Sequence, residues 1–174
     1  MIKNSVKYED LIKDFESRNI PFDNPGFYDH PNFIQVEEKN ASFICNYAKF
    51  VHERPREEEY DKFVQHCVPI VANTYQQKLI GANVKPDTSI PALISKAFEK
   101  IGIWNYVVKG SVLIDFPHDS GIDSKHFWSI VESGFTTAHA WVVAPPFYVI
   151  DIILNLHNFT EDESDFIPDV IYSE

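Results

Sequence analysis

The chain has 174 residues, of which 44% are hydrophobic, 14% aromatic and 24% charged, a composition typical of one globular domain that buries its own core. Its 15 Lys and Arg against 26 Asp and Glu leave a formal net charge of −11, which argues against binding to nucleic acid or to an anionic membrane surface. Because cysteines are scarce and no apolar leader or 18-residue apolar window is present, we expect a soluble, cytoplasmic protein.

The first hundred residues are predicted to be mainly helical. Apolar residues recur at helical spacing over 5–18, 41–52 and 90–102, and a further helix is expected to begin at Pro55. Cys67 is predicted to lie at the start of another helix that ends at Gly81, because Pro69 is tolerated in a first helical turn and disruptive further in. The aromatic, proline-punctuated stretch 26–39 is expected to be an ordered loop.

After residue 102 the pattern changes to strands. Four segments rich in Val, Ile and aromatic residues predict an antiparallel meander: 104–116, 125–132, 136–144 and 147–154. Helices followed by strands predict an α+β fold, with N-terminal helices packed on a C-terminal antiparallel sheet. We expect a single domain over 1–174, divided into an N-terminal extension (1–60), a core (63–155) and an acidic segment (156–174) that is either a solvated tail or a flap bearing a strand.

Cys67, His139 and Asp151 form a candidate catalytic triad. A thiolate is a nucleophile, and a helix N-terminus and a neighbouring imidazolium both stabilise it. Asp151 interrupts the otherwise apolar segment 147–154, and since burying an unpaired carboxylate is costly, it requires a partner. His139 on the preceding strand is the partner that we predict.

The loop around Pro145 and Pro146 decides whether His139 reaches Asp151. A three-residue loop closed by Val143 and Phe147, or a five-residue loop closed by Val142 and Tyr148, places His139 directly opposite Asp151. A two- or four-residue loop would place the two side chains on opposite faces of the sheet. We therefore expect one of the odd-numbered loops.

Three stretches carry a resemblance to a known family: "QHCVPIVANTYQQKL", "KAFEKIGIWNYVVKG" and "TAHAWVVAPPFYVIDI". Over residues 63–155 the chain resembles the transglutaminase-like branch of the papain-like cysteine peptidase superfamily. The resemblance implies a papain-like core with Cys67 as nucleophile, His139 as base and Asp151 as the orienting carboxylate. The long helix-loop-helix after Cys67, and the absence of small residues beside it, depart from the family pattern.

The implied function is a cysteine-dependent hydrolase that cleaves a peptide or amide bond through a Cys67 thioester, without a cofactor. Gln65 is a candidate oxyanion donor, together with the backbone N–H of Cys67, and Trp141 is a candidate wall of the site. A transglutaminase or acyltransferase using the same triad is the first alternative. A non-catalytic interaction protein that keeps the fold is the second.

The remaining candidate residues are not predicted to take part in catalysis. Cys45 is predicted to be a buried structural cysteine in the middle of a helix. The loop that carries His118, Asp119, Asp123 and His126 matches no standard metal-binding spacing, so no metal is expected there. The aromatic residues of 22–50 either line a groove for a peptide-like substrate or pack in the core: Phe22, Phe27, Tyr28, Phe33 and Phe43.

Overall fold

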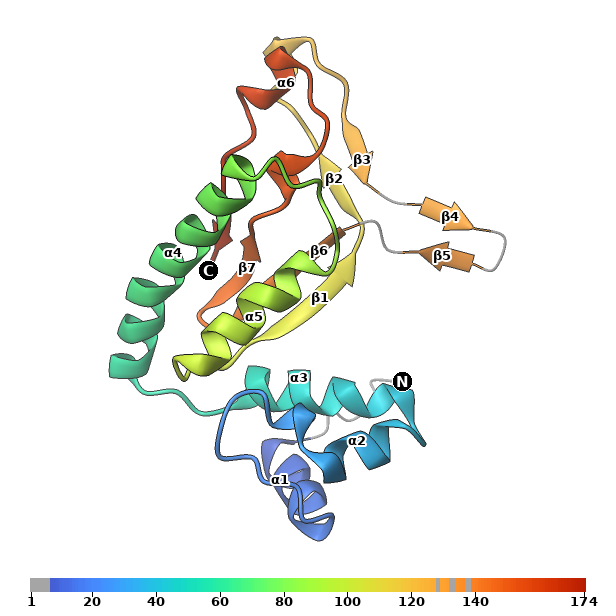
Figure 1. The fold of residues 1–174 in the computed structure, drawn as a ribbon, viewed down its shortest axis with the longest axis vertical. Helices are drawn as coiled ribbons and strands as arrows, with labels where there is room; N and C mark the ends of the chain where they lie inside the picture. The colour runs from blue at the N-terminus through green and yellow to red at the C-terminus, as the bar shows by residue number, and fades with distance from the viewer. Residues whose placement is uncertain (1–6, 128, 132–133, 137–138) are drawn as a thin grey trace.

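The computed structural model describes residues 7–127, 129–131, 134–136 and 139–174 (Figure 1). Residues 5 and 6 of the first predicted helix, and residues 128, 132, 137 and 138 of the predicted strands, lie outside the described residues. Helices dominate the first hundred residues and antiparallel strands dominate the rest, so the predicted α+β class is confirmed.

The N-terminal part consists of short helices around an aromatic cluster. The elements are α1 (Tyr8–Ser17), α2 (Pro31–Glu37) and α3 (Ile44–Glu53), with 3-10 turns η1 (Phe27–Asp29) and η2 (Ala41–Phe43). The expected loop over 26–39 was wrong, because it contains η1 and α2. Pro31 fits the first turn of α2, and the His30 ring accepts a hydrogen bond from the Asn32 N–H at 3.2 Å, which caps that helix.

Most of the aromatic residues proposed as a possible substrate groove are core residues instead. Phe15, at the centre of the N-terminal cluster, is fully buried and packs against five other Phe rings. The candidates buried with it are Phe27, Phe33 and Phe43, and Phe22 is packed against their cluster. Trp104, which precedes the first strand, also belongs to this cluster and joins the N-terminal helices to the sheet.

Two longer helices, α4 (Glu58–Gly81) and α5 (Ile90–Lys100), cover one face of the sheet (Figure 1). The predicted break near Cys67 was wrong: α4 runs without interruption through Pro69. Every fourth residue on one side of α4 is fully buried, both before and after the proline, and these residues belong to the main hydrophobic cluster: Val64, Val68 and Ala72. Burial of these residues offsets the roughly 3 kcal/mol that a proline costs inside a helix.

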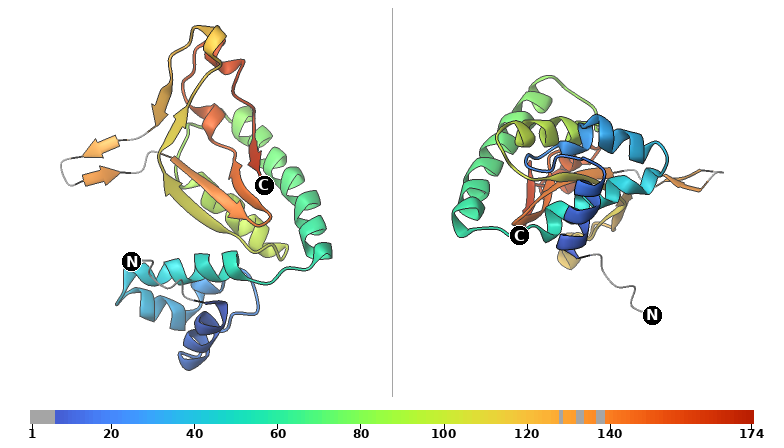
Figure 2. Two further views of the ribbon diagram at one scale, coloured as in Figure 1. Left: turned by 180° about the vertical axis from the view of Figure 1, so that it is seen from behind. Right: turned by 90° about the horizontal axis from the view of Figure 1, so that it is seen from below.

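The main sheet has four antiparallel strands in the order β1-β6-β7-β8. Two separate hairpins, β2-β3 and β4-β5, connect β1 to β6, so the predicted single meander was wrong. In the main sheet only the pairing of β6 with β7 follows it, and β8 lies beyond its four segments. The strand bounds are β1 (Tyr106–Gly110), β2 (Val112–Ile114), β3 (Lys125–Phe127), β4 (Ser129–Val131), β5 (Gly134–Thr136), β6 (His139–Ala144), β7 (Phe147–Asp151) and β8 (Ile171–Ser173). The left view of Figure 2 shows the sheet from behind, with the strands in front of α5 and with α4 to one side.

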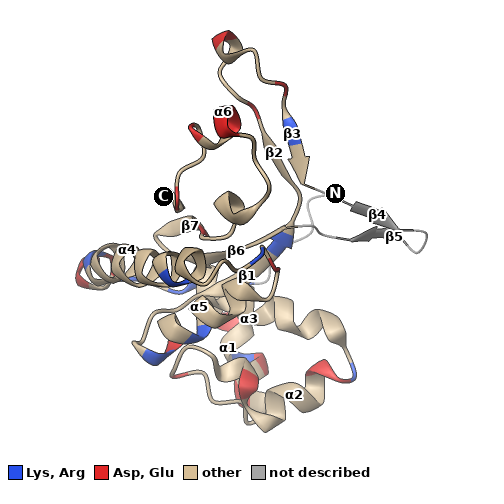
Figure 3. Ribbon diagram, turned by 45° about the horizontal axis from the view of Figure 1, so that its top comes forward, with Lys and Arg blue, Asp and Glu red and all other residues tan. Residues whose placement is uncertain are grey.

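The acidic C-terminal segment carries a strand. After the 3-10 turn η4 (Leu154–Leu156), the short helix α6 (Glu161–Ser164) is capped by Thr160, and β8 then pairs with β7. Acidic residues are concentrated in α6 and the adjoining chain (Figure 3), in a part of the sequence that has no Lys or Arg after Lys125. Among the described residues, no helix combines the length and the apolar composition needed to cross a membrane.

Candidate functional site

The C-terminal end of β7 and the N-terminal end of β6 bring an imidazole and a carboxylate together. His139 Nε2 lies 2.5 Å from Asp151 Oδ2, and the two side chains are 0% and 5% exposed. The other carboxylate oxygen, Asp151 Oδ1, accepts the backbone N–H groups of Ile153 at 3.0 Å and Leu154 at 3.1 Å. These bonds fix the carboxylate, so the expected partnership between His139 and Asp151 is present.

The hairpin that joins these strands differs from the expected one. Ala144 pairs with Phe147, which makes a two-residue loop of Pro145 and Pro146, and such a loop was predicted to separate His139 from Asp151. A register irregularity between Val142 and Ala144 shifts the pairing again, so that Val142 faces Ile150. An irregularity of this kind adds one residue to one strand and returns His139 and Asp151 to a common face.

The chemistry of the dyad depends on the free nitrogen of His139. Because Nε2 faces the carboxylate, that nitrogen carries the proton in the neutral ring and Nδ1 keeps a lone pair. His139 Nδ1 is buried and has no hydrogen-bond partner in the part of the chain that the structure describes. A buried acceptor without a partner costs about 1 to 3 kcal/mol, which is a cost associated with functional positions.

His157 is a third member of the site that the sequence interpretation missed. It follows η4, and its ring centroid lies 5.5 Å from that of His139 and 4.3 Å from that of Phe127 on β3. Burial, together with the neighbouring His139, lowers the pKa of His157 below the usual histidine value. Its position six residues after Asp151, beyond a turn, carries no periodic signal that would have linked it to the dyad.

Trp141, the predicted wall of the site, lies beside the His139 ring. Its ring stacks against His139 with centroids 6.3 Å apart and an interplanar angle of 27°. A Cβ at Gly110, the β1 residue paired with His139, would come within 2.8 Å of the Trp141 ring. The lack of a side chain at Gly110 therefore leaves room for the indole of Trp141. Like His157, Gly110 was not identified from the sequence.

Cys67 is not part of this arrangement. It lies more than two turns inside α4 and packs against the cluster that contains Val142 and Ile150. Side chains alternate between faces along a strand, so His139 and Asp151 point to the opposite face of the sheet from those two residues. Of the described side chains, none forms a hydrogen bond with the Cys67 thiol, and the prediction of a thiol at a helix start beside His139 was wrong.

Gln65, the predicted oxyanion donor, forms a hydrogen bond outside the His139–Asp151 site. Its Nε2 donates to Glu174 Oε1 at 3.0 Å, near the end of the chain, and the pair is exposed. An oxyanion donor has to be held close to the reacting carbonyl, and this side chain is held elsewhere.

Cys45 differs from its expected structural role as well. It is the second residue of α3 and is exposed, whereas Cys67 is only partly buried. The helix breaks at Phe43 and Ile44, where η2 passes into α3, and this break places the thiol near a helix start.

Comparison of the chain with family models, with curated proteins and with solved structures found no match. The likeness to papain-like peptidases therefore rests on the sequence stretches named above and is not extended by these comparisons. Within the described residues, no group of three or more His, Cys, Asp or Glu side chains is arranged to hold a metal ion.

Proposed function

We propose that this protein is a hydrolase of a peptide or amide bond in which His139 acts as general base and Asp151 orients it. The observation that carries the proposal is the buried His139 Nδ1, which has no described partner while Nε2 is committed to a fixed carboxylate. This is the arrangement that a base requires: one nitrogen sets the tautomer and the other receives the proton.

The reaction that we propose uses water as the nucleophile. His139 Nδ1 takes one proton from the water as its oxygen bonds to the substrate carbonyl carbon. The same proton is then transferred to the nitrogen of the leaving amine as the carbon–nitrogen bond breaks. Asp151 keeps the Nε2 proton throughout and stabilises the imidazolium that forms between the two steps.

Cys67 has no role in this mechanism. A thioester route, whether it ends in hydrolysis or in acyl transfer, requires a thiol within reach of the base, and the position of Cys67 in α4 does not support one. The proposal therefore keeps the predicted base and carboxylate, and replaces the predicted thiol with water.

The test is cleavage of a synthetic peptide library, followed by mass spectrometry, with wild-type protein and matched variants. We expect His139→Gln and Asp151→Asn to lower the cleavage rate about 10²- to 10⁴-fold. Cys67→Ala should leave the rate unchanged, as should His126→Gln, which removes an exposed histidine on β3. Loss of activity in Cys67→Ala would contradict the water mechanism and favour the thioester.

A non-catalytic binding protein is the second candidate. The observation that favours it is the complete burial of His139, which is also what a structural clamp between β6 and β7 would show. This candidate predicts that wild-type protein cleaves no member of the library, and that His139→Gln changes stability alone. Cleavage that depends on His139 would exclude it.

A further inference from the structure

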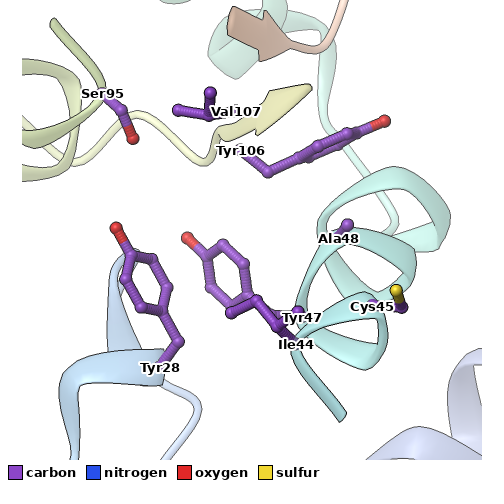
Figure 4. A pocket seen from close by; sticks show the side chains of 8 residues that line it. All are labelled: Tyr28, Ile44, Cys45, Tyr47, Ala48, Ser95, Tyr106 and Val107. Atoms are coloured by element: carbon purple, nitrogen blue, oxygen red, sulfur yellow. The ribbon is translucent and has the colours of Figure 1, made fainter. Parts of the chain in front are cut away.

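A cavity of about 280 Å³ lies where the N-terminal helices meet the sheet, away from the His139–Asp151 dyad. Its walls come from η1, α3, α5 and β1, and carbon atoms form most of the lining (Figure 4). The lining includes three tyrosines, a cysteine and two small residues: Tyr28, Tyr47, Tyr106, Cys45, Ala48 and Ser95. Pockets between packed units, lined by aromatic rings and a few polar groups, are common places for small ligands.

Two unused hydrogen-bond donors face this cavity. Ser95 is 2% exposed, and its hydroxyl, which points into the cavity in Figure 4, forms no hydrogen bond with a described residue. Tyr47 is 1% exposed, and its hydroxyl oxygen accepts the Gly26 N–H at 2.9 Å while its own proton has no acceptor among residues 7–127 and 139–174. Buried hydroxyls are normally paired, so both are suited to a ligand acceptor.

The charges beside the cavity are already compensated. Tyr28 donates its hydroxyl proton to Glu99 at 2.7 Å, and Lys96 forms ion pairs with Glu99 at 2.8 Å and with Asp29 at 2.6 Å. Burial raises the pKa of Tyr28 to about 12, and burial raises the pKa of Tyr47 as well. Both phenols are therefore neutral donors near pH 7, and none of the described residues that line the cavity offers an unpaired charge to a ligand.

We infer that this cavity binds a small neutral ligand made of a fused two-ring system with one carbonyl oxygen. Its rings would lie against Tyr28, Tyr47 and Tyr106, and its oxygen would accept hydrogen bonds from the hydroxyl groups of Ser95 and Tyr47. The size follows from volume, because a dry cavity of about 150 Å³ holds one benzene ring, and this cavity is about twice as large. The inference is independent of the proposed hydrolase activity.

The probe is 1-tetralone, a neutral bicyclic ketone, compared with tetralin, the hydrocarbon without the oxygen. Binding is measured by ligand-observed NMR and by the rate at which iodoacetamide alkylates Cys45, the exposed thiol on the cavity wall. Cys67 lies outside the cavity wall and serves as an internal reference. We expect 1-tetralone to slow alkylation of Cys45 and to leave that of Cys67 unchanged.

Two variants separate the cavity from nonspecific binding. Ser95→Ala should weaken 1-tetralone about fivefold, as expected for one hydrogen bond, while leaving tetralin unaffected. Ala48→Leu, which adds volume at the wall, should abolish binding of both compounds. If Ala48→Leu does not fold, Ser95→Ala alone still decides the outcome.

The inference is overturned by any of three results. One is the absence of 1-tetralone binding up to its solubility limit. The second is equal affinity for 1-tetralone and tetralin that Ser95→Ala does not change. The third is a gain of stability in Ala48→Leu without any ligand binding to the wild type, which would identify the cavity as a packing gap.

Discussion

His139 contacts Asp151 although the two residues do not face each other directly across β6 and β7. Continuing the register from the Val142–Ile150 pair by one residue places Asp151 opposite Trp141, two positions from His139. The 2.5 Å contact is therefore diagonal, and it forms because both side chains point to the same face. His139 and Asp151 can therefore form a hydrogen bond because they share a face of the sheet, even though they are not directly opposite each other.

The tautomer of His139 is the first testable consequence. In Asp151→Asn the new amide can keep accepting the Ile153 N–H with its oxygen while its NH₂ group faces His139 Nε2. Nε2 must then accept a hydrogen bond from this NH₂ group with its lone pair, so the ring proton moves to Nδ1 and the proposed base is lost. We expect the ¹⁵N resonances of the His139 ring to exchange their protonation pattern, and the cleavage rate to fall about 10²- to 10⁴-fold.

His126→Gln is the matched control for this measurement, because His126 is an exposed histidine on β3 and is not part of the dyad. It should leave the His139 resonances and the cleavage rate unchanged. An Nδ1 of His139 that stays unprotonated in Asp151→Asn would contradict the assigned tautomer.

The pairing of His139 with Asp151 could be predicted because it depends on a local signal. A carboxylate within an apolar strand needs a partner, and a hairpin limits the choice to the neighbouring strand. The hairpin loop has two residues, one fewer than the shorter predicted loop. The irregularity between Val142 and Ala144 shifts the pairing by one residue and so returns the two side chains to the same face. A sequence contains no direct sign of such an irregularity, so the common face was predicted correctly from an incorrect register.

The position of Cys67 could not be predicted by local helix rules. Pro69 is unfavourable inside a helix, and that preference indicated a helix start. The buried stripe of Val64, Val68 and Ala72 outweighs it by tertiary packing, and its fourfold spacing on both sides of the proline was the signal for one continuous helix. Reading that spacing before the proline would have removed Cys67 from the candidate site.

The pH dependence of stability should report on His157. Its pKa in the folded protein lies below the usual value of about 6.5, so the unfolded chain binds the proton more readily. The free energy of unfolding should therefore be fully maintained above about pH 6.5. It should decrease as the pH falls from about 6.5 through the lower pKa that His157 has in the folded protein. Urea unfolding at pH 5.5, 6.5 and 7.5 measures this slope, and His157→Gln should reduce it.

The control for this slope is again His126→Gln, which removes an exposed histidine on β3 and leaves His157 in place. A slope that is the same in wild type and His157→Gln would show that another group is responsible.

Gly26 should be one of the positions most sensitive to a single methyl group. Its φ is +81°, and an added Cβ would come within 2.5 Å of Glu99 Oε2, which Tyr28 and Lys96 hold in place. We expect Gly26→Ala to lower the free energy of unfolding by about 2 to 3 kcal/mol, from backbone strain and the clash together.

Gly121→Ala is the control, because Gly121 has a φ of +70° but open space around it. Its free energy of unfolding should fall by about 1 kcal/mol, from backbone strain alone. Equal losses in urea unfolding would show that the Glu99 contact contributes nothing.

Gly110 links the packing of the sheet to the dyad. In Gly110→Ala the new methyl group would meet the far edge of the Trp141 ring, so the indole must move and its stacking on His139 must change. Because the end of a side chain can shift, we expect a loss of stability of no more than about 1 to 2 kcal/mol. The cleavage rate should nevertheless fall, and the Trp141 indole and His139 ring resonances should shift together. Gly81→Ala adds the same methyl group at the end of α4, where nothing lies within 4 Å. It should leave the cleavage rate and both ring resonances unchanged, and raise stability by no more than about 1 kcal/mol. If Gly110→Ala cleaves peptides at the wild-type rate with a displaced indole, then the contact between Trp141 and His139 has no part in the reaction.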